Sequence, residues 1–212
     1  MIRSLDSGRD NAKMIEYLLP FGAYVAALLL PLMPGIAISA HAAYLAEILV
    51  AGLLLAVFWK RYKITFRLSP WPFITAAAIF LVWIGLEGRY PAFGTSYFEP
   101  PNTFYLLLKL VGSATVVAAV EELFTRGFLA RYLTARNWKG LAYGRFNAAS
   151  FIITVLFFGL SHYRWLPALI SGVMLNLLIM KEKNIGSTIV AHGAANLLLG
   201  LYVVYEGSWG LW

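Results

Sequence analysis

The residues best suited to chemistry stand in the segment 120–129, where Glu121, Glu122 and Arg126 interrupt an otherwise apolar run. Only one charge, Lys109, precedes them in the same run. Ionisable side chains inside a membrane-spanning helix are costly, so they indicate a functional site. In an α-helix, Glu122 and Arg126 share a face and are predicted to form an ion pair. Glu121 then points elsewhere and is free for acid–base chemistry, unless all three simply form a buried polar cluster that joins helices.

Two later segments carry histidines that complete a possible hydrolytic set. Phe158-Gly159-Leu160-Ser161-His162 ends one segment, and His192-Gly193-Ala194-Ala195-Asn196 lies in another. His192 and Asn196 share a helical face, and the small residues between them allow a helix or a substrate backbone to come close. With Glu121 they supply a base, two imidazoles and an amide donor, as an enzyme that activates water requires. Each residue alone is more typical of hydrogen-bonded packing between helices.

Composition places these residues in a membrane protein. Of the 212 residues, 60% are hydrophobic and 13% are charged, which is about half the charged share of a soluble domain. We expect an all-α, polytopic helix bundle that forms one integral-membrane domain over residues 1–212, with a cytoplasmic tail at residues 1–14. The net charge of +7 comes from scattered loop residues, which favours anionic lipid over nucleic acid as the partner. The absence of cysteine excludes disulfides and thiolate chemistry.

Seven apolar segments are predicted to span the membrane, with the approximate limits 15–38, 41–59, 69–86, 103–133, 146–162, 165–180 and 185–205. Lys and Arg concentrate in every second connection, so the positive-inside rule places the N-terminus in the cytoplasm. Pro20, Pro31 and Pro34 should kink or end the first span. The fourth span is longer than a membrane requires.

These limits place the candidate residues at different depths in the membrane. Glu121 falls near the middle of its span, His162 near the outer end of its own, and His192 near an inner end. Residues of one site must lie at similar depth. A common site therefore requires kinked spans or different span limits.

The order and spacing of these residues resemble a known family. Glu121-Glu122-x-x-x-Arg126, Phe158-x-x-x-His162 and His192-x-x-x-Asn196 match, in order, the three motifs of the CAAX protease and bacteriocin-processing (CPBP) family. That family includes the CAAX prenyl endopeptidase type and the bacterial Abi proteins. The resemblance covers residues 111–199, which we expect to be the catalytic half. The N-terminal half shows only a generic membrane composition, and the prenyl endopeptidases have eight spans where we count seven.

The resemblance implies a glutamic intramembrane endopeptidase that needs no cofactor and no metal. Glu121, assisted by His162, would activate a water molecule. His192 and Asn196 would stabilise the oxyanion formed at the scissile carbonyl. An amide or imidazole donor suits that task in a water-poor cavity.

The same resemblance implies that Glu122 and Arg126 hold the site together and that Phe158 contacts the substrate. The expected partners are membrane lipid and a membrane-associated protein or peptide, and the expected location is a bacterial inner membrane. The substrate would carry either a prenylated CAAX tail or a C-terminal sorting anchor. The stretch Trp83-Ile84-Gly85-Leu86-Glu87-Gly88 resembles relatives of the second kind, although an interfacial Trp before a turn has the same pattern.

Three other functions remain open at this stage. Two His and one Glu could hold zinc with an open position, but the sequence has no His-Glu-x-x-His motif. The polar cluster could also join the helices of a membrane scaffold or an immunity-type binding protein. A transporter is less consistent with the sequence, because matching halves with interrupted spans are not seen.

A chelator separates the first of these alternatives from a glutamic protease. We expect proteolysis by the purified protein to persist after incubation with excess EDTA or phenanthroline, because no step would use a metal. A loss of activity that added zinc restores would contradict this expectation.

Overall fold

A computed structural model describes residues 7–94 and 96–212 of the chain, and within these ranges every regular element is helical. The predicted all-α class is therefore confirmed. Six helices connected by loops are α1 (Ser7–Leu29), α2 (Ala40–Tyr62), α3 (Trp71–Leu86), α7 (Ala148–Leu160), α8 (Trp165–Glu182) and α9 (Ile185–Glu206). Short 3-10 turns are η1 (Leu30–Leu32), η4 (Trp138–Gly140) and η5 (Trp209–Leu211).

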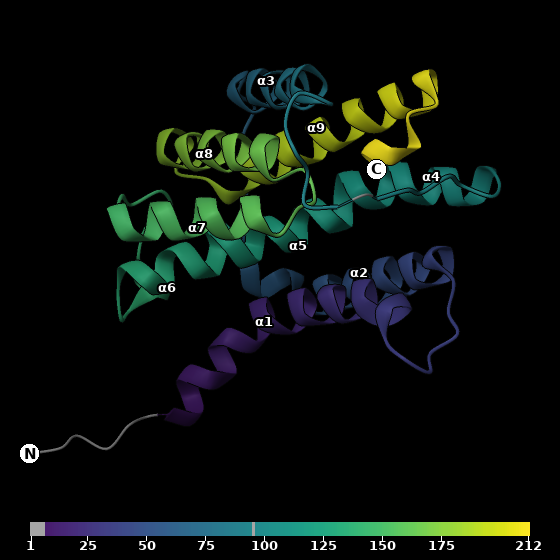
Figure 1. The fold of residues 1–212 in the computed structure, drawn as a ribbon. Helices are drawn as coiled ribbons and strands as arrows, with labels where there is room; N and C mark the ends of the chain where they lie inside the picture. Colours follow the sequence, from purple (N-terminus) through teal and green to yellow (C-terminus); the bar gives the residue numbers. More distant parts are fainter. Residues whose placement is uncertain (1–6, 95) are drawn as a thin grey trace, which may run out of the picture.

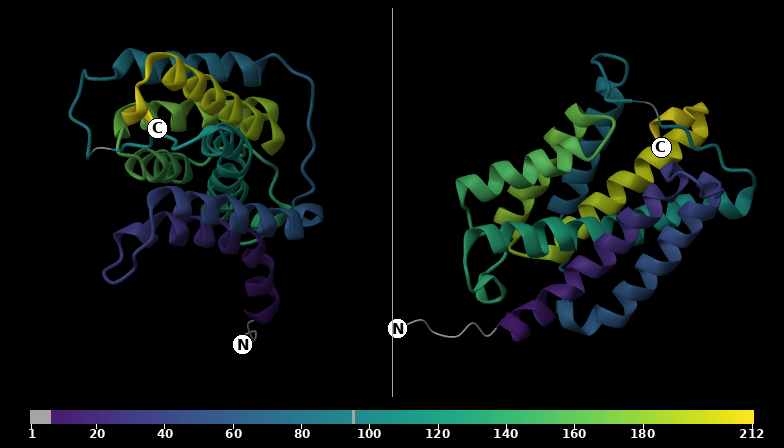
Figure 2. Two further views of the ribbon diagram at one scale, coloured as in Figure 1. Left: turned by 90° about the vertical axis from the view of Figure 1, so that its right-hand side faces the viewer. Right: turned by 60° about the horizontal axis from the view of Figure 1, so that its bottom comes forward.

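The remaining elements join into one uninterrupted helical rod over residues 103–134. It consists of α4 (Thr103–Gly112), the π-helical segment η2 (Ser113–Val117), α5 (Ala118–Glu122), the π-helical segment η3 (Leu123–Leu129) and α6 (Ala130–Thr134). The rod crosses the middle of the molecule, with the α1–α2 pair on one side and α7, α8 and α9 on the other (Figure 1). A second view shows the same layers, with α3 beyond α8 and α9 (Figure 2).

Five helical stretches are long and apolar enough to cross a membrane, namely Met14–Leu32, Ala40–Tyr62, Thr103–Thr134, Trp165–Glu182 and Ile185–Glu206. The helices α3 and α7 are apolar but shorter. Each of the seven predicted segments thus corresponds to one helical stretch. The exposed stripe of Leu49, Leu53 and Val57 on α2 is the kind of surface that faces lipid. The count of seven spans and the cytoplasmic N-terminus stay predictions.

The ends of two predicted spans need correction. The first helix ends at Leu29 instead of near residue 38, because Pro31 lies in the 3-10 turn that follows and proline cannot continue the hydrogen-bond ladder. The same helix begins at Ser7, so residues 7–14 of the expected cytoplasmic tail are part of it. Residues 1–6 of that tail lie outside the described ranges. The fifth span ends at Leu160, which leaves His162 in the turn before α8.

Asparagine caps begin the three stretches that carry the site motifs. The side-chain Oδ1 atoms of Asn102, Asn147 and Asn184 accept hydrogen bonds from main-chain N–H groups two or three residues later, at 3.1, 3.0 and 2.9 Å. Such caps satisfy N–H groups that the first helical turn leaves unpaired. They fix where the rod, α7 and α9 begin, and therefore where each motif lies along its helix.

Close packing between α9 and the first π segment brings the third motif against the rod. A Cβ atom added at Gly193 would lie 2.1 Å from the carbonyl oxygen of Ala114, so only glycine fits there. Asn196, one turn later, donates from Nδ2 to the carbonyl oxygen of Ser113 at 2.9 Å. The small residues predicted to allow a close approach therefore do so toward the rod. π-helical turns are often found at functional sites.

We expect Gly193→Ala to lower the free energy of unfolding by about 1–3 kcal/mol, as overpacking does. Gly22→Ala is the matched control, because a Cβ at this helical glycine meets nothing within 4 Å and alanine has the higher helix propensity. Thermal unfolding in detergent measures both variants. Equal midpoints for the two would show that α9 does not pack against the rod in this way.

Candidate active site

A buried ion pair lies at the centre of the rod. Arg126 Nη1 donates to Glu122 Oε1 at 2.8 Å, and both side chains are inaccessible to solvent. The predicted pairing across one helical turn is therefore present. Arg126 also donates from Nε to Asn176 Oδ1 at 3.1 Å and from Nη2 to the carbonyl oxygen of Gly172 at 3.3 Å. These bonds attach the rod to α8.

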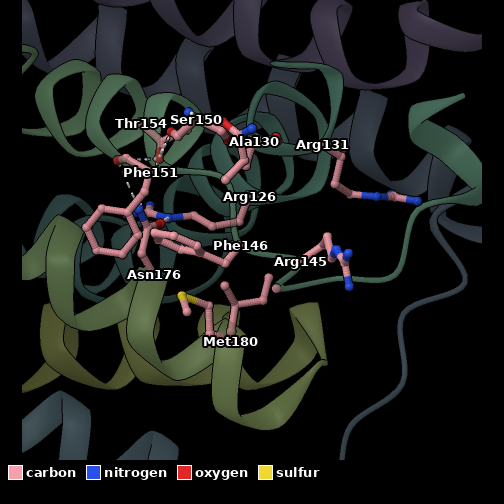
Figure 3. Close-up of a pocket in the computed structure, with 13 residues that line it drawn as sticks. Arg126, Ala130, Arg131, Arg145, Phe146, Ser150, Phe151, Thr154, Asn176 and Met180 are labelled. Atoms are coloured by element: carbon pink, nitrogen blue, oxygen red, sulfur yellow. Dashed lines mark hydrogen bonds between the residues drawn. The ribbon is translucent and has the colours of Figure 1, made fainter. Parts of the chain in front are cut away.

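Asn176 carries the network on to α7. Its Nδ2 donates to Thr154 Oγ1 at 3.0 Å, and Thr154 Oγ1 donates to the carbonyl oxygen of Ser150 at 2.8 Å. Figure 3 shows this side of the network, where Arg126, Thr154 and Asn176 line a pocket of about 30 Å³. That volume is too small for a peptide, so this end of the network is structural. Nothing in the spacing of Asn176 and Thr154 distinguishes them from other polar residues of apolar helices.

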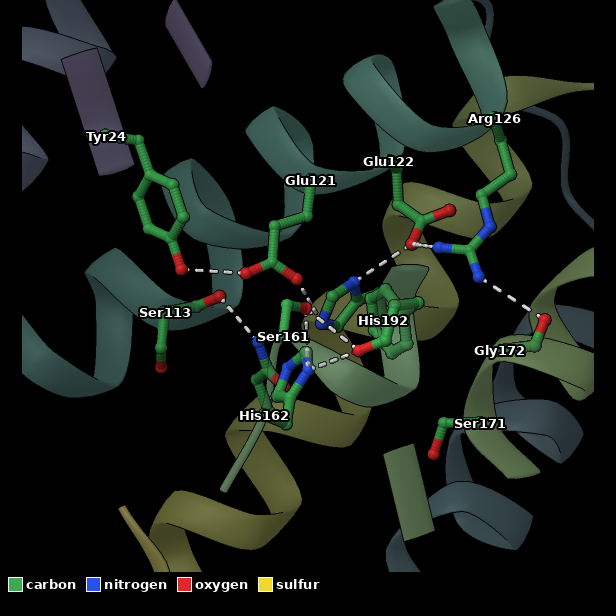
Figure 4. Close-up of polar contacts among 12 residues, drawn as sticks. Tyr24, Ser113, Glu121, Glu122, Arg126, Ser161, His162, Ser171, Gly172 and His192 are labelled. Atoms are coloured by element: carbon green, nitrogen blue, oxygen red, sulfur yellow. Dashed lines mark hydrogen bonds and ion pairs between the residues drawn. The ribbon is translucent and has the colours of Figure 1, made fainter. Parts of the chain in front are cut away.

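Glu122 also orients the imidazole of His192 (Figure 4). His192 Nδ1 lies 3.1 Å from Glu122 Oε1. A carboxylate only accepts, so Nδ1 carries the hydrogen and donates it. The other ring nitrogen, Nε2, lies 3.9 Å from Glu121 Oε2. One carboxylate of the doublet therefore fixes the ring, and the ring presents its second nitrogen to the other carboxylate.

Glu121 lies on another side of the rod from Arg126, as the helical spacing predicts. Its Oε1 accepts a hydrogen bond of 2.8 Å from the Tyr24 hydroxyl of α1. Its Oε2 is buried and has no hydrogen-bond partner among the described residues. The imidazole that it faces is that of His192, and within the described ranges no ring nitrogen of His162 lies within 4.0 Å of a Glu121 carboxylate oxygen.

His162 lies in the turn after α7, with its Nδ1 donating to the carbonyl oxygen of Phe158 at 2.6 Å. The Phe158 ring contacts both imidazoles, with its centroid 4.8 Å from that of His162 and 5.5 Å from that of His192. Arg126 lies over the same ring at 4.6 Å, and Trp83 contacts His162 at 6.1 Å. Phe158 is buried and forms part of the cavity wall, and its contact with a substrate stays a prediction.

The four predicted catalytic residues line one cavity of about 440 Å³, namely Glu121, His162, His192 and Asn196. Glu122 and Arg126 are not among the residues that line this cavity.

The predicted difference in membrane depth between Glu121 and His162 is resolved by the length of α7. The 13 residues of this helix extend about 20 Å at 1.5 Å per residue. A membrane core is about 30 Å thick, so the turn with His162 can lie inside it.

The N-terminal half of the chain contributes three polar residues that the motifs do not include to the wall of the same cavity, namely Tyr24, Tyr44 and Glu47.

In residues 7–94 and 96–212, no three His, Asp or Glu side chains gather as a metal site would require. The zinc alternative therefore has no ligand set within these ranges.

We expect Glu122→Ala to destabilise the protein by about 3–5 kcal/mol, because it leaves the Arg126 guanidinium buried without its anion. Glu121→Ala, one residue earlier in the same helix, removes no partner of Arg126 and should cost much less. Yield after detergent extraction and the thermal midpoint measure both. Equal losses would contradict the separate roles of the two carboxylates.

Comparison with known families gives one match. The family described as type II CAAX prenyl endopeptidase Rce1-like matches residues 102–198, which hold all three motifs and begin at the cap of the central rod. No curated protein and no solved structure matches the chain. The predicted family resemblance is confirmed over residues 102–198, where this chain is similar to the Rce1-like, CAAX-protease-related membrane proteins.

Proposed function

We propose that this protein is a glutamic intramembrane endopeptidase in which Glu121 activates a water molecule. The observation that carries the proposal is the position of Glu121 in the cavity. Its Oε2 atom lies 3.9 Å from His192 Nε2, while Glu122 neutralises Arg126. The family match supports the wider class, a CAAX-protease-type membrane endopeptidase.

The gap between Glu121 and His192 suits a bound water. With Nδ1–H donated to Glu122, a neutral His192 offers a lone pair at Nε2, so both facing atoms are acceptors. A water molecule at about 2.8 Å from each, the usual distance for such bonds, donates one hydrogen to each. His192 therefore suits the binding of the nucleophile together with Glu121, the role that the family resemblance gives to His162.

The reaction follows from these positions. The water oxygen attacks the scissile carbonyl carbon while Glu121 accepts a proton from it. Asn196 has one N–H left after its bond to Ser113, and it donates to the oxyanion, as does His162 when protonated. The C–N bond then breaks as Glu121 returns the proton to the amide nitrogen, which yields a carboxylic acid and an amine.

The cavity wall favours a substrate that is itself in the membrane. Apolar residues from several helices line it beside the polar group, namely Val25, Leu28, Ile79, Leu175 and Leu199. Such a surface suits an apolar segment or a lipid-modified C-terminal tail. We propose a prenylated tail or a C-terminal anchor peptide as substrate and a bacterial inner membrane as location.

A non-catalytic scaffold accounts less well for this group. Polar residues that only join helices gain by pairing all of their buried atoms. Both Glu121 Oε2 and Glu122 Oε2 are buried without a partner among the described residues, but of the two glutamates Glu121 lines the cavity, with its Oε2 across from the His192 imidazole. That arrangement suits a water-binding base better than a structural contact.

We expect Glu121→Gln to lower proteolysis by at least about 100-fold, since a general base contributes about 10²–10⁴-fold. The thermal midpoint should stay near that of the unmodified protein. The control is Glu206→Gln, an exposed carboxylate at the end of α9. The assay uses proteoliposomes with fluorescent peptides that carry either a farnesylated CAAX tail or an apolar C-terminal anchor. Undiminished cleavage by Glu121→Gln would rule out this mechanism.

A further inference from the structure

A tyrosine from outside the matched region reaches the proposed catalytic base. The family match begins at residue 102, whereas Tyr24 belongs to α1. Its hydroxyl donates to Glu121 Oε1 at 2.8 Å. Figure 4 shows the two side chains facing one another, and Tyr24 lines the same cavity as His192. This is the one hydrogen bond that Glu121 makes to another described side chain.

We propose that Tyr24 is a positioning residue that fixes the carboxylate plane of Glu121, so that the N-terminal helix pair is part of the active site. The proposal rests on the function proposed above. The terminal torsion of a glutamate side chain is broad, so a carboxylate without a donor has no fixed plane. With Oε1 held by Tyr24, Oε2 stays opposite His192 Nε2 at 3.9 Å.

Three successive side-chain contacts, or rungs, join α1 to the rod, and the first two hold Tyr24 in place at the third. Tyr17 stacks on Phe128 with ring centroids 6.1 Å apart, and Phe21 stacks on Phe124 at 3.9 Å with an interplanar angle of 8°. Gly127 makes room at the first rung, because a Cβ there would lie 3.2 Å from the Tyr17 ring.

The residues that make these contacts have the same spacing on α1 and on the rod, counted in opposite directions along the two helices. Steps of four and then three residues lead from Tyr17 through Phe21 to Tyr24, and from Phe128 through Phe124 to Glu121. Each residue of one series contacts its counterpart in the other. The third rung therefore differs from the first two, because Glu121 replaces a ring and Tyr24 supplies the hydroxyl that meets it. Packing alone would need only the ring of Tyr24, so the hydroxyl acts on the carboxylate.

The test is Tyr24→Phe, which keeps the ring and removes the O–H group. We expect kcat to fall about 10- to 100-fold, the value of one hydrogen bond to a charged group, while KM stays unchanged. Tyr62→Phe is the matched control, because this buried tyrosine donates to the main-chain oxygen of Glu16 at 2.5 Å within the same helix pair. It should lower stability without changing kcat.

A second arm needs no substrate. Thermal unfolding in detergent is measured for Tyr24→Phe, for Glu121→Ala and for the double variant. The contact predicts that Tyr24→Phe lowers the midpoint in the unmodified protein but much less in the Glu121→Ala background. Equal shifts in both backgrounds would overturn the proposal.

The kinetic and unfolding experiments together distinguish failure of the positioning role from failure of the proposed function. If Glu121→Gln is inactive while Tyr24→Phe retains full kcat, the positioning role is wrong and the proposed function stands. If Glu121→Gln remains active, the proposed function fails and the positioning role fails with it. A fall in kcat for Tyr24→Phe, together with coupled unfolding, supports the proposal.

Discussion

The buried pair of Glu122 and Arg126 is the interaction on which the rest of the structure depends. A single charge at this depth costs several kcal/mol, and its partner offsets that cost only with good geometry and further hydrogen bonds. Arg126 obtains these bonds from Asn176 and Gly172 of α8. Glu122 obtains one from His192 of α9. The same pair thus gathers three helical stretches and fixes the ring that faces Glu121, so stability and the proposed chemistry have a common origin.

The two halves of the chain meet along the rod with different kinds of contact. On one side the aromatic rungs of α1 pack on η3, and Tyr24 meets Glu121. On the other side α9 packs so closely on η2 that Gly193 touches the backbone. The cavity lies between these two surfaces. The N-terminal helices, which show only generic membrane composition in sequence, therefore complete a wall of the site.

The sequence predicts the seven apolar helices, the partner of Arg126 and the separate direction of Glu121, because these follow from hydrophobic runs and from a four-residue spacing. It does not predict the π segments on either side of α5, since one extra residue in a turn leaves no mark in an apolar pattern. The contact of Tyr24 depends on how α1 packs on the rod, which no local spacing contains. The position of His162 after α7 follows from the early end of that helix, and apolar runs place helix ends poorly.

The central claim is that Glu121 and His192 face one another across a single cavity, and paired cysteines measure this directly. The chain has no cysteine of its own, so Glu121→Cys combined with His192→Cys gives one defined pair. In native membranes a short bismaleimide should join the two, and mass spectrometry should detect the linked peptides. The control pair combines Glu121→Cys with Leu201→Cys, on the exposed face of α9. Efficient linkage of the first pair alone is the predicted result, and failure to link it, or equal linkage of both pairs, would contradict the account.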